Sequence, residues 1–121
     1  MSDHDNVREQ GKALMRDVYG WDFEPTKEFE VRTVDHLFGD IWAQGKLSVR
    51  DRRLLLIGLC AGSGLEDVAG LQLDAALAKG ELDAEDLRYL VVFIAHYAGW
   101  PRAAKLNSEV EQLIARRERS A

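Results

Sequence analysis

Repeated start and stop signals for helices constrain this chain more than any other feature of its sequence. Asp83 and Asp86 have the spacing of an N-terminal capping pair, and the preceding Gly80 suits the left-handed cap that ends a helix. Gly99 and Pro101 mark another end and another start. No segment shows the two-residue alternation of a half-buried strand. The sequence therefore predicts an all-α domain of about six helices.

The same signals place the individual helices. We expect them near residues 7–18, 26–44, 48–61, 65–79, 84–98 and 101–114. Ser48 and Asp51 resemble a capping box at the third start. Residues 54–61 are apolar on every side, so we expect that helix to be buried all round. The charged tail, residues 115–121, is predicted to fray.

Length and charge exclude several classes of protein. A chain of 121 residues fits one domain over 1–121, with residues 1–25 as an N-terminal helical extension. Net charge is −5, with 21 acidic and 16 basic residues and no basic stripe, so nucleic acid is not an expected partner. No secretion signal and no run of about 18 apolar residues is present. We expect a cytoplasmic protein without a membrane span.

Cysteine and histidine usage excludes further chemistry. Cys60 is the only cysteine, so one chain forms no internal disulfide and no cysteine-based zinc site. Its place in the most apolar helix favours a packing role and a raised thiol pKa. His4, His36 and His96 show no metal-ligand spacing. Neither a metal nor another cofactor is predicted.

The helix expected over 84–98 has two apolar faces. One stripe suits the core of the domain, and it consists of Leu87, Leu90, Val91 and Ile94. The other stripe is aromatic, and it consists of Tyr89, Phe93, His96, Tyr97 and Trp100. A small monomer rarely exposes so large an apolar patch, so the second face indicates a partner subunit or a ligand pocket.

Two side chains are candidates for proton transfer or substrate orientation. His96 stands at a helix end among aromatic residues, where it transfers protons or is hydrogen-bonded at an interface. Gln72 lies on the inward stripe of Leu65, Ala69 and Ala76. Its amide orients a substrate carbonyl, bonds to a neighbouring backbone group or faces a wet crevice. These alternatives stay open.

Arg50, Arg52 and Arg53 crowd the first turn of a helix, where the helix dipole favours negative side chains. Arginine there either binds a carboxylate with its planar fork or pairs with acidic residues of another subunit. The acidic residues considered for that pairing are Glu66, Asp67, Asp83, Glu85 and Asp86.

Three segments together resemble the carboxymuconolactone decarboxylase family. Residues 41–55 contain a Trp, then Gly-x-Leu, then an arginine-rich start to an apolar helix. Residues 75–80 resemble the family's Ala-Leu-x-x-Gly helix end, and residues 97–103 its Tyr-x-Gly-x-Pro-x-Ala motif. Their order extends the resemblance from about Phe29 to Ile114. It implies an alkyl hydroperoxidase D-like subunit that forms trimers or hexamers.

The residues that perform chemistry in that family differ here. The resemblance implies a Cys-x-x-Cys pair followed by a histidine at Leu65, Val68 and Gln72, with a supporting glutamate at Arg53. Decarboxylase members also place a histidine where Gln72 stands. An amide supplies no proton at neutral pH, and disulfide exchange needs a second thiol. Arg52 matches a family arginine that can hold a carboxylate.

Three functions follow from these observations. The first is a lyase of aromatic compound degradation that decarboxylates a small carboxylated lactone or aromatic-derived acid. Its catalytic residues would be His96, Arg52 and Gln72, and its substrate-binding residues Trp42, Tyr97 and Trp100. The second is a non-catalytic oligomer that binds a small carboxylated molecule. The third, a dithiol peroxidase, is disfavoured by the missing Cys-x-x-Cys.

Overall fold

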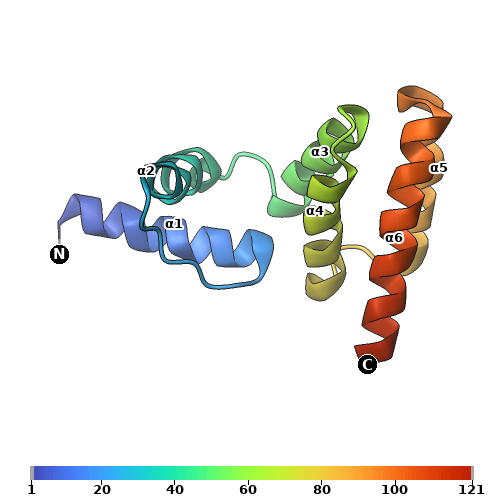
Figure 1. The fold of residues 1–121 in the computed structure, drawn as a ribbon. Coiled ribbons are helices and arrows are strands. Elements are labelled where there is room, and N and C mark those ends of the chain that lie inside the picture. The colour runs from blue at the N-terminus through green and yellow to red at the C-terminus, as the bar shows by residue number, and fades with distance from the viewer. Residues whose placement is uncertain (1, 121) are drawn as a thin grey trace. The chain divides into compact units, whose positions relative to one another are not determined.

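The computed structural model describes residues 2–120, and every regular element in that range is helical (Figure 1). The all-α prediction is therefore confirmed. In chain order the elements are α1 Asp3–Tyr19, α2 Glu28–Arg32, η1 Thr33–Ile41, η2 Trp42–Gln44, α3 Val49–Gly62, α4 Glu66–Lys79, α5 Ala84–Ala98 and α6 Trp100–Ser120. None of the described helices is long and apolar enough to cross a membrane. The chain forms two compact units, residues 1–49 and 50–121.

In the first unit, α1 packs closely against the segment η1. A Cβ atom added at Gly11 would lie 2.1 Å from the Val34 carbonyl oxygen, and one added at Gly39 would lie 2.8 Å from a Val7 methyl carbon. At Gly11 the atom in the way belongs to the backbone, so only glycine permits this close approach. Arg8 fixes the same pair of elements through two hydrogen bonds to Asp35, at 2.5 and 2.9 Å. The core of this unit consists of Met15, Val18, Val34, Phe38 and Trp42.

The segment expected as one ordinary helix over 26–44 is instead divided into three. After α2, the nine residues of η1 form a π-helix, and η2 is a short 3₁₀ turn. The Trp42 amide donates to the Leu37 carbonyl, five residues back, which is the π-helical pattern. Apolar spacing in the sequence does not distinguish these kinds of helix. Glu30 confirms the predicted opening, because its carboxylate accepts bonds from the Thr26 and Lys27 amides.

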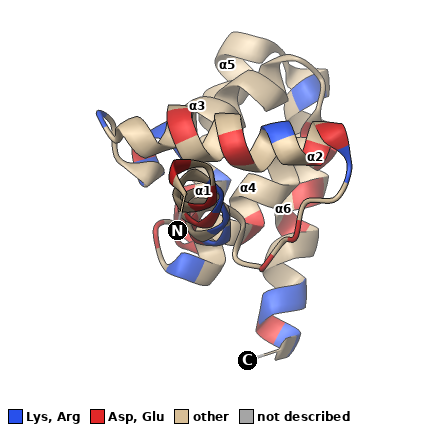
Figure 2. Ribbon diagram, turned by 90° about the vertical axis from the view of Figure 1, so that its left-hand side faces the viewer, with Lys and Arg blue, Asp and Glu red and all other residues tan. Residues whose placement is uncertain are grey.

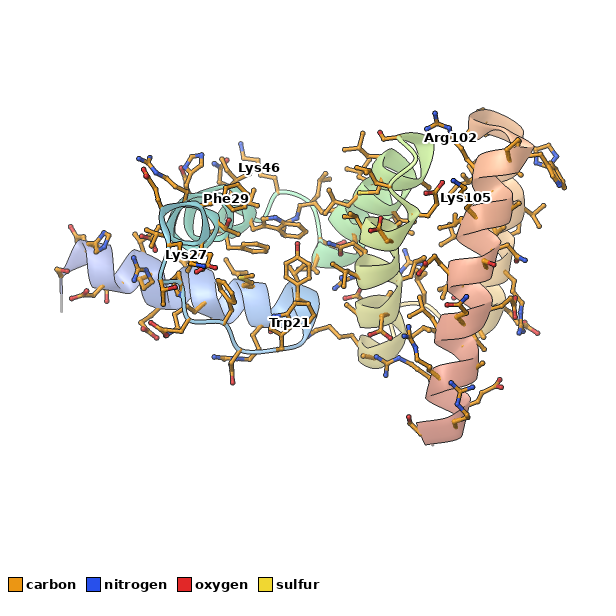
Figure 3. The ribbon with its side chains drawn as sticks, in the orientation of Figure 1. Trp21, Lys27, Phe29, Lys46, Arg102 and Lys105 are labelled. Atoms are coloured by element: carbon orange, nitrogen blue, oxygen red, sulfur yellow. The ribbon has the colours of Figure 1, made fainter. Side chains whose placement is uncertain are left out.

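The second unit is a bundle of α3 to α6, in which α6 runs beside both α4 and α5 (Figure 1). Its core includes Ile57, Leu73, Leu87, Leu106 and Val110. The predicted helix limits are confirmed where the signals were strongest. Gly80 ends α4 with φ at +71°, and Asp83 and Asp86 each accept the other's backbone amide, at 2.8 and 3.0 Å. Arg102, labelled in Figure 3, donates to the Gly62 carbonyl at the end of α3.

Two expectations for this unit are wrong. The helix α3 is not buried all round, because Leu55 and Leu59 are 63% and 65% exposed. Its buried residues, Arg53, Ile57 and Ala61, form a stripe that is one residue wide at each turn. The charged tail is helical up to Ser120, and within it Arg117 pairs with Asp74 at 2.9 Å. Residue 121 lies outside the described part of the chain.

Candidate functional site

An arginine occupies the inward stripe of α3. Arg53 precedes Ile57 and Ala61 at four-residue intervals, which places the three on one face of the helix. Its side chain has no exposed surface. Removing a guanidinium from water is costly unless its N–H groups are hydrogen-bonded, so its partners decide what this position can do.

Arg53 is paired within its own chain. Its Nε donates to Oε1 of Glu81 at 2.5 Å, and its Nη2 donates to Oε2 of the same carboxylate at 3.3 Å. Its Nη1 donates to Oε1 of Gln72 at 2.8 Å. The Glu81 side chain is 17% exposed, so the ion pair reaches the surface only through Glu81. We call Arg53, Gln72 and Glu81 the arginine cluster.

Three segments bring the arginine cluster together. Gln72 is 4% exposed and lies on the inward side of α4 with Ala69 and Leu73, which confirms the predicted facing of its amide. Its partner is a side chain, however, and not the backbone group or wet crevice that we considered. Glu81 follows Gly80 in the turn between α4 and α5. Arg50 also reaches this turn, with its Nε 3.3 Å from the Glu81 carbonyl oxygen.

From the sequence we predict Arg52 as a carboxylate ligand and five acidic residues as intersubunit partners, and these roles stay predictions. Arg52, the predicted carboxylate ligand, is half-buried, whereas its neighbour Arg53 is fully enclosed. The carboxylate shown to pair with Arg53 within the chain belongs to Glu81, which is not one of those five residues. The stripe Arg53, Ile57 and Ala61 was a usable sign that this arginine faces inward. Nothing in the sequence indicated Glu81 as the partner of Arg53, since 28 residues separate the two.

His96 lies on the outer side of α5 and is exposed. Its Nδ1 is 2.7 Å from the Val92 carbonyl oxygen, and its ring meets Trp100 edge-on at 6.1 Å. Because a carbonyl only accepts, Nδ1 bears the hydrogen, and Nε2 of the neutral ring is left as a proton acceptor.

The three aromatic residues predicted to bind substrate are not alike. Tyr97 and Trp100 are 82% and 66% exposed on the second unit. Trp42 belongs to the first unit, where it is buried and stacked on Phe38 at a ring separation of 5.5 Å. Its place in a core favours a packing role there. Substrate binding by any of the three stays a prediction.

A cavity of about 300 Å³ lies between α5 and α6. Trp100 lines it together with Val91, Ala95 and Ala103, and Asn107 adds one amide. No charged side chain is among its lining residues. This cavity suits an apolar group better than a carboxylate.

The comparison with known families supports the resemblance. The sequence pattern described as the carboxymuconolactone decarboxylase family matches residues 27–112. The chain belongs to the carboxymuconolactone decarboxylase family. No curated protein and no solved structure matches it significantly.

Two residues of the arginine cluster stand at positions where members of the carboxymuconolactone decarboxylase family have functional residues. Arg53 and Gln72 stand where the resemblance implies a glutamate and a histidine, and the structure shows that these two replacements are hydrogen-bonded to each other. Leu65 and Val68, where it implies two cysteines, are 48% and 41% exposed. Among residues 2–120, no group of three or more His, Cys, Asp or Glu side chains is placed to hold a metal ion.

Proposed function

We propose that this chain is a non-catalytic member of the carboxymuconolactone decarboxylase family that binds a small carboxylated molecule. The observation that supports this proposal most is the hydrogen bond between Arg53 and Gln72, at the positions where the resemblance implies a glutamate and a histidine. A buried arginine and the amide hydrogen-bonded to it stand in place of these two residues.

The replacement removes the groups that known family reactions need. Loss of carbon dioxide leaves an enolate-like intermediate that must be protonated, and neither an amide nor a guanidinium supplies that proton at neutral pH. A dithiol peroxidase needs a second thiol beside an activated one. Cys60 is the only cysteine, and burial raises the pKa of its thiol. Both reactions are therefore disfavoured at this position.

Self-assembly into trimers or hexamers is part of the proposal. Beyond Arg88, α5 has no Asp, Glu, Lys or Arg, and this uncharged part of the helix is tan in Figure 2. Tyr89, Phe93 and Tyr97 stand four residues apart on it, are 49–82% exposed and pack in sequence at ring separations of 6.1 and 5.3 Å. A second copy would remove this apolar surface from water.

The experiment that tests the proposal is ultraviolet-monitored turnover of 4-carboxymuconolactone by the wild type and by Gln72→His. We expect no turnover by the wild type, together with saturable binding of the lactone in a calorimetric titration. Gln72→His restores the family's titratable group at one position and serves as the comparison. Wild-type turnover above the enzyme-free rate would contradict a non-catalytic role.

One observation supports a lyase as the second candidate. The hydrogen bond from His96 to Val92 orients the ring and leaves Nε2 as a base beside Trp100, which lines the cavity between α5 and α6. In that case His96 replaces the missing histidine, and Arg52 holds the carboxylate. Turnover by the wild type that collapses in His96→Ala, while the oligomer stays intact, would favour this candidate.

A further inference from the structure

The Glu81 carboxylate is bound by Arg53 in the way that the carboxylate of a ligand would be bound. The Nε and Nη2 of Arg53 approach the two oxygens of one Glu81 carboxylate, which is the fork-to-carboxylate geometry by which arginine recognises carboxylate ligands. Gln72 accepts from the remaining nitrogen, Nη1, and so fixes the plane of the guanidinium. The cluster therefore has a preformed receptor, Arg53 with Gln72, and an internal carboxylate bound to it.

The two halves of this pair differ in their burial and in the segments that carry them. Arg53 lies inside a helix and is fully buried, and Gln72 lies inside another. Glu81 lies in a turn, directly after a glycine whose φ is +71°, and part of its side chain is in contact with water. The carboxylate is thus the component that reaches the surface, and the guanidinium is the component that is fully enclosed.

We propose that Arg53 and Gln72 form a binding site for small monocarboxylates, which Glu81 keeps closed from within. This inference rests on the proposed function and names the residues that would bind its ligand. When the carboxylate of a ligand replaces that of Glu81, Arg53 remains paired and Glu81 moves into water. No buried charge is left alone at the end of the exchange.

The covalent attachment of Glu81 to the chain determines how strongly the wild type binds a free carboxylate. Glu81 is attached to the same chain, so it competes with a free acid at a high effective concentration. A ligand must therefore be abundant or must gain further contacts to displace it. Removing the Glu81 carboxylate should expose the full affinity of the receptor.

Glu81→Ala is the variant that tests this idea, because it deletes one CH₂ and one carboxylate, which together have the size of acetate. We would measure the urea midpoint at pH 7 in sodium acetate or sodium chloride of equal ionic strength. Ligands that bind only the folded state raise its stability. The midpoint of Glu81→Ala should rise with acetate and not with chloride. If it does not rise in acetate beyond chloride, the site is excluded.

Two matched variants separate a site from a general salt effect. Glu111→Ala breaks another two-bond arginine pair, with Arg88 at 3.0 Å, whose side chains are about half exposed, and it should show no preference for acetate. Arg53→Met with Glu81→Ala removes the receptor and should abolish the acetate response. An equal response in either variant would overturn the proposal.

Failure to fold does not prevent the test. If Glu81→Ala is unfolded in chloride, it is diluted from urea into acetate and into chloride. Refolding in acetate alone supports the site, and refolding in neither salt overturns it.

The closing role of Glu81 is tested in the wild type by following the Arg53 Nε–H resonance during an acetate titration. We expect the signal to move at acetate concentrations at least about tenfold higher than those that saturate Glu81→Ala, because hydrogen bonds to a charged group contribute on the order of tenfold each. A signal that stays fixed, or that moves equally easily in both proteins, would overturn closure by Glu81. Lactone turnover by the wild type would overturn the non-catalytic role and leave these acetate results unaffected.

Discussion

At the scale of single residues, the decisive feature is an arginine on a stripe that is otherwise apolar. Arg53 is buried in the second unit, where Glu81 and Gln72 accept hydrogen bonds from its guanidinium. A buried ion pair adds little net stability, since desolvation of both charges offsets most of their attraction, but removing one partner leaves a buried charge uncompensated. Glu81 is therefore worth more to the fold than an exposed glutamate is.

We expect Glu81→Ala to lower the free energy of unfolding by about 3–5 kcal/mol in chloride buffer, because Arg53 is left buried without its carboxylate. Urea denaturation followed by circular dichroism measures this change. Arg53→Met combined with Glu81→Ala should recover most of the loss, since an apolar side chain of similar length fills the space. A loss no larger than that of Glu111→Ala would contradict the buried pairing.

Cys60 gives a second prediction at this scale. Burial raises the pKa of its thiol, so the thiolate fraction at a given pH is smaller than in a free peptide. We expect iodoacetamide to alkylate the folded protein at pH 8 more slowly than a cysteine peptide, and to alkylate the urea-unfolded protein at the peptide rate. Equal rates for the folded protein and the peptide would show an exposed thiol.

At the scale of elements, glycines decide how closely α1 approaches the π-helix. A Cβ atom at Gly11 would overlap the Val34 carbonyl oxygen, and one at Gly39 would force the Val7 side chain to shift. Gly58 in α3 is different, because a Cβ atom added there would meet nothing within 4 Å. Glycine therefore permits a close helix contact in α1, whereas in α3 it only lowers the stability of the helix.

A matched pair of substitutions tests this difference. Gly11→Ala should destabilise the first unit by about 3 kcal/mol or more, because backbone atoms must move to admit a methyl group. Gly58→Ala should stabilise the protein by about 0.5–1 kcal/mol, through helix propensity alone. Thermal unfolding of both variants measures the two shifts, and shifts of the same sign would refute the packing of α1 on η1.

At the scale of the whole molecule, the feature to explain is the apolar surface that the chain leaves exposed. On the second unit these faces include Leu55 and Leu59 of α3 and the aromatic ladder of α5, Tyr89, Phe93 and Tyr97. Such surface favours association with further copies of the chain.

We expect light scattering to show trimers or hexamers for the wild type. Phe93→Asp should shift the population toward the monomer, because it places an unpaired charge in the centre of the ladder. Gln112→Asp adds the same charge at an exposed position of α6 and should leave the oligomer unchanged. A wild type that is monomeric at all concentrations would exclude the assembly.

The sequence by itself determined the helical class, the family and most helix limits, because capping residues, glycines and prolines act on backbone within a few residues of themselves. Asp83, Gly80 and Pro101 illustrate this local control. It also placed Gln72 inward, since helical periodicity is a local property as well. What only the tertiary structure decided was the identity of the partners. Arg53 pairs with Glu81 across 28 residues, and η1 takes its π-helical form beside α1. Both features depend on which segments meet in space, and local sequence patterns do not specify those contacts.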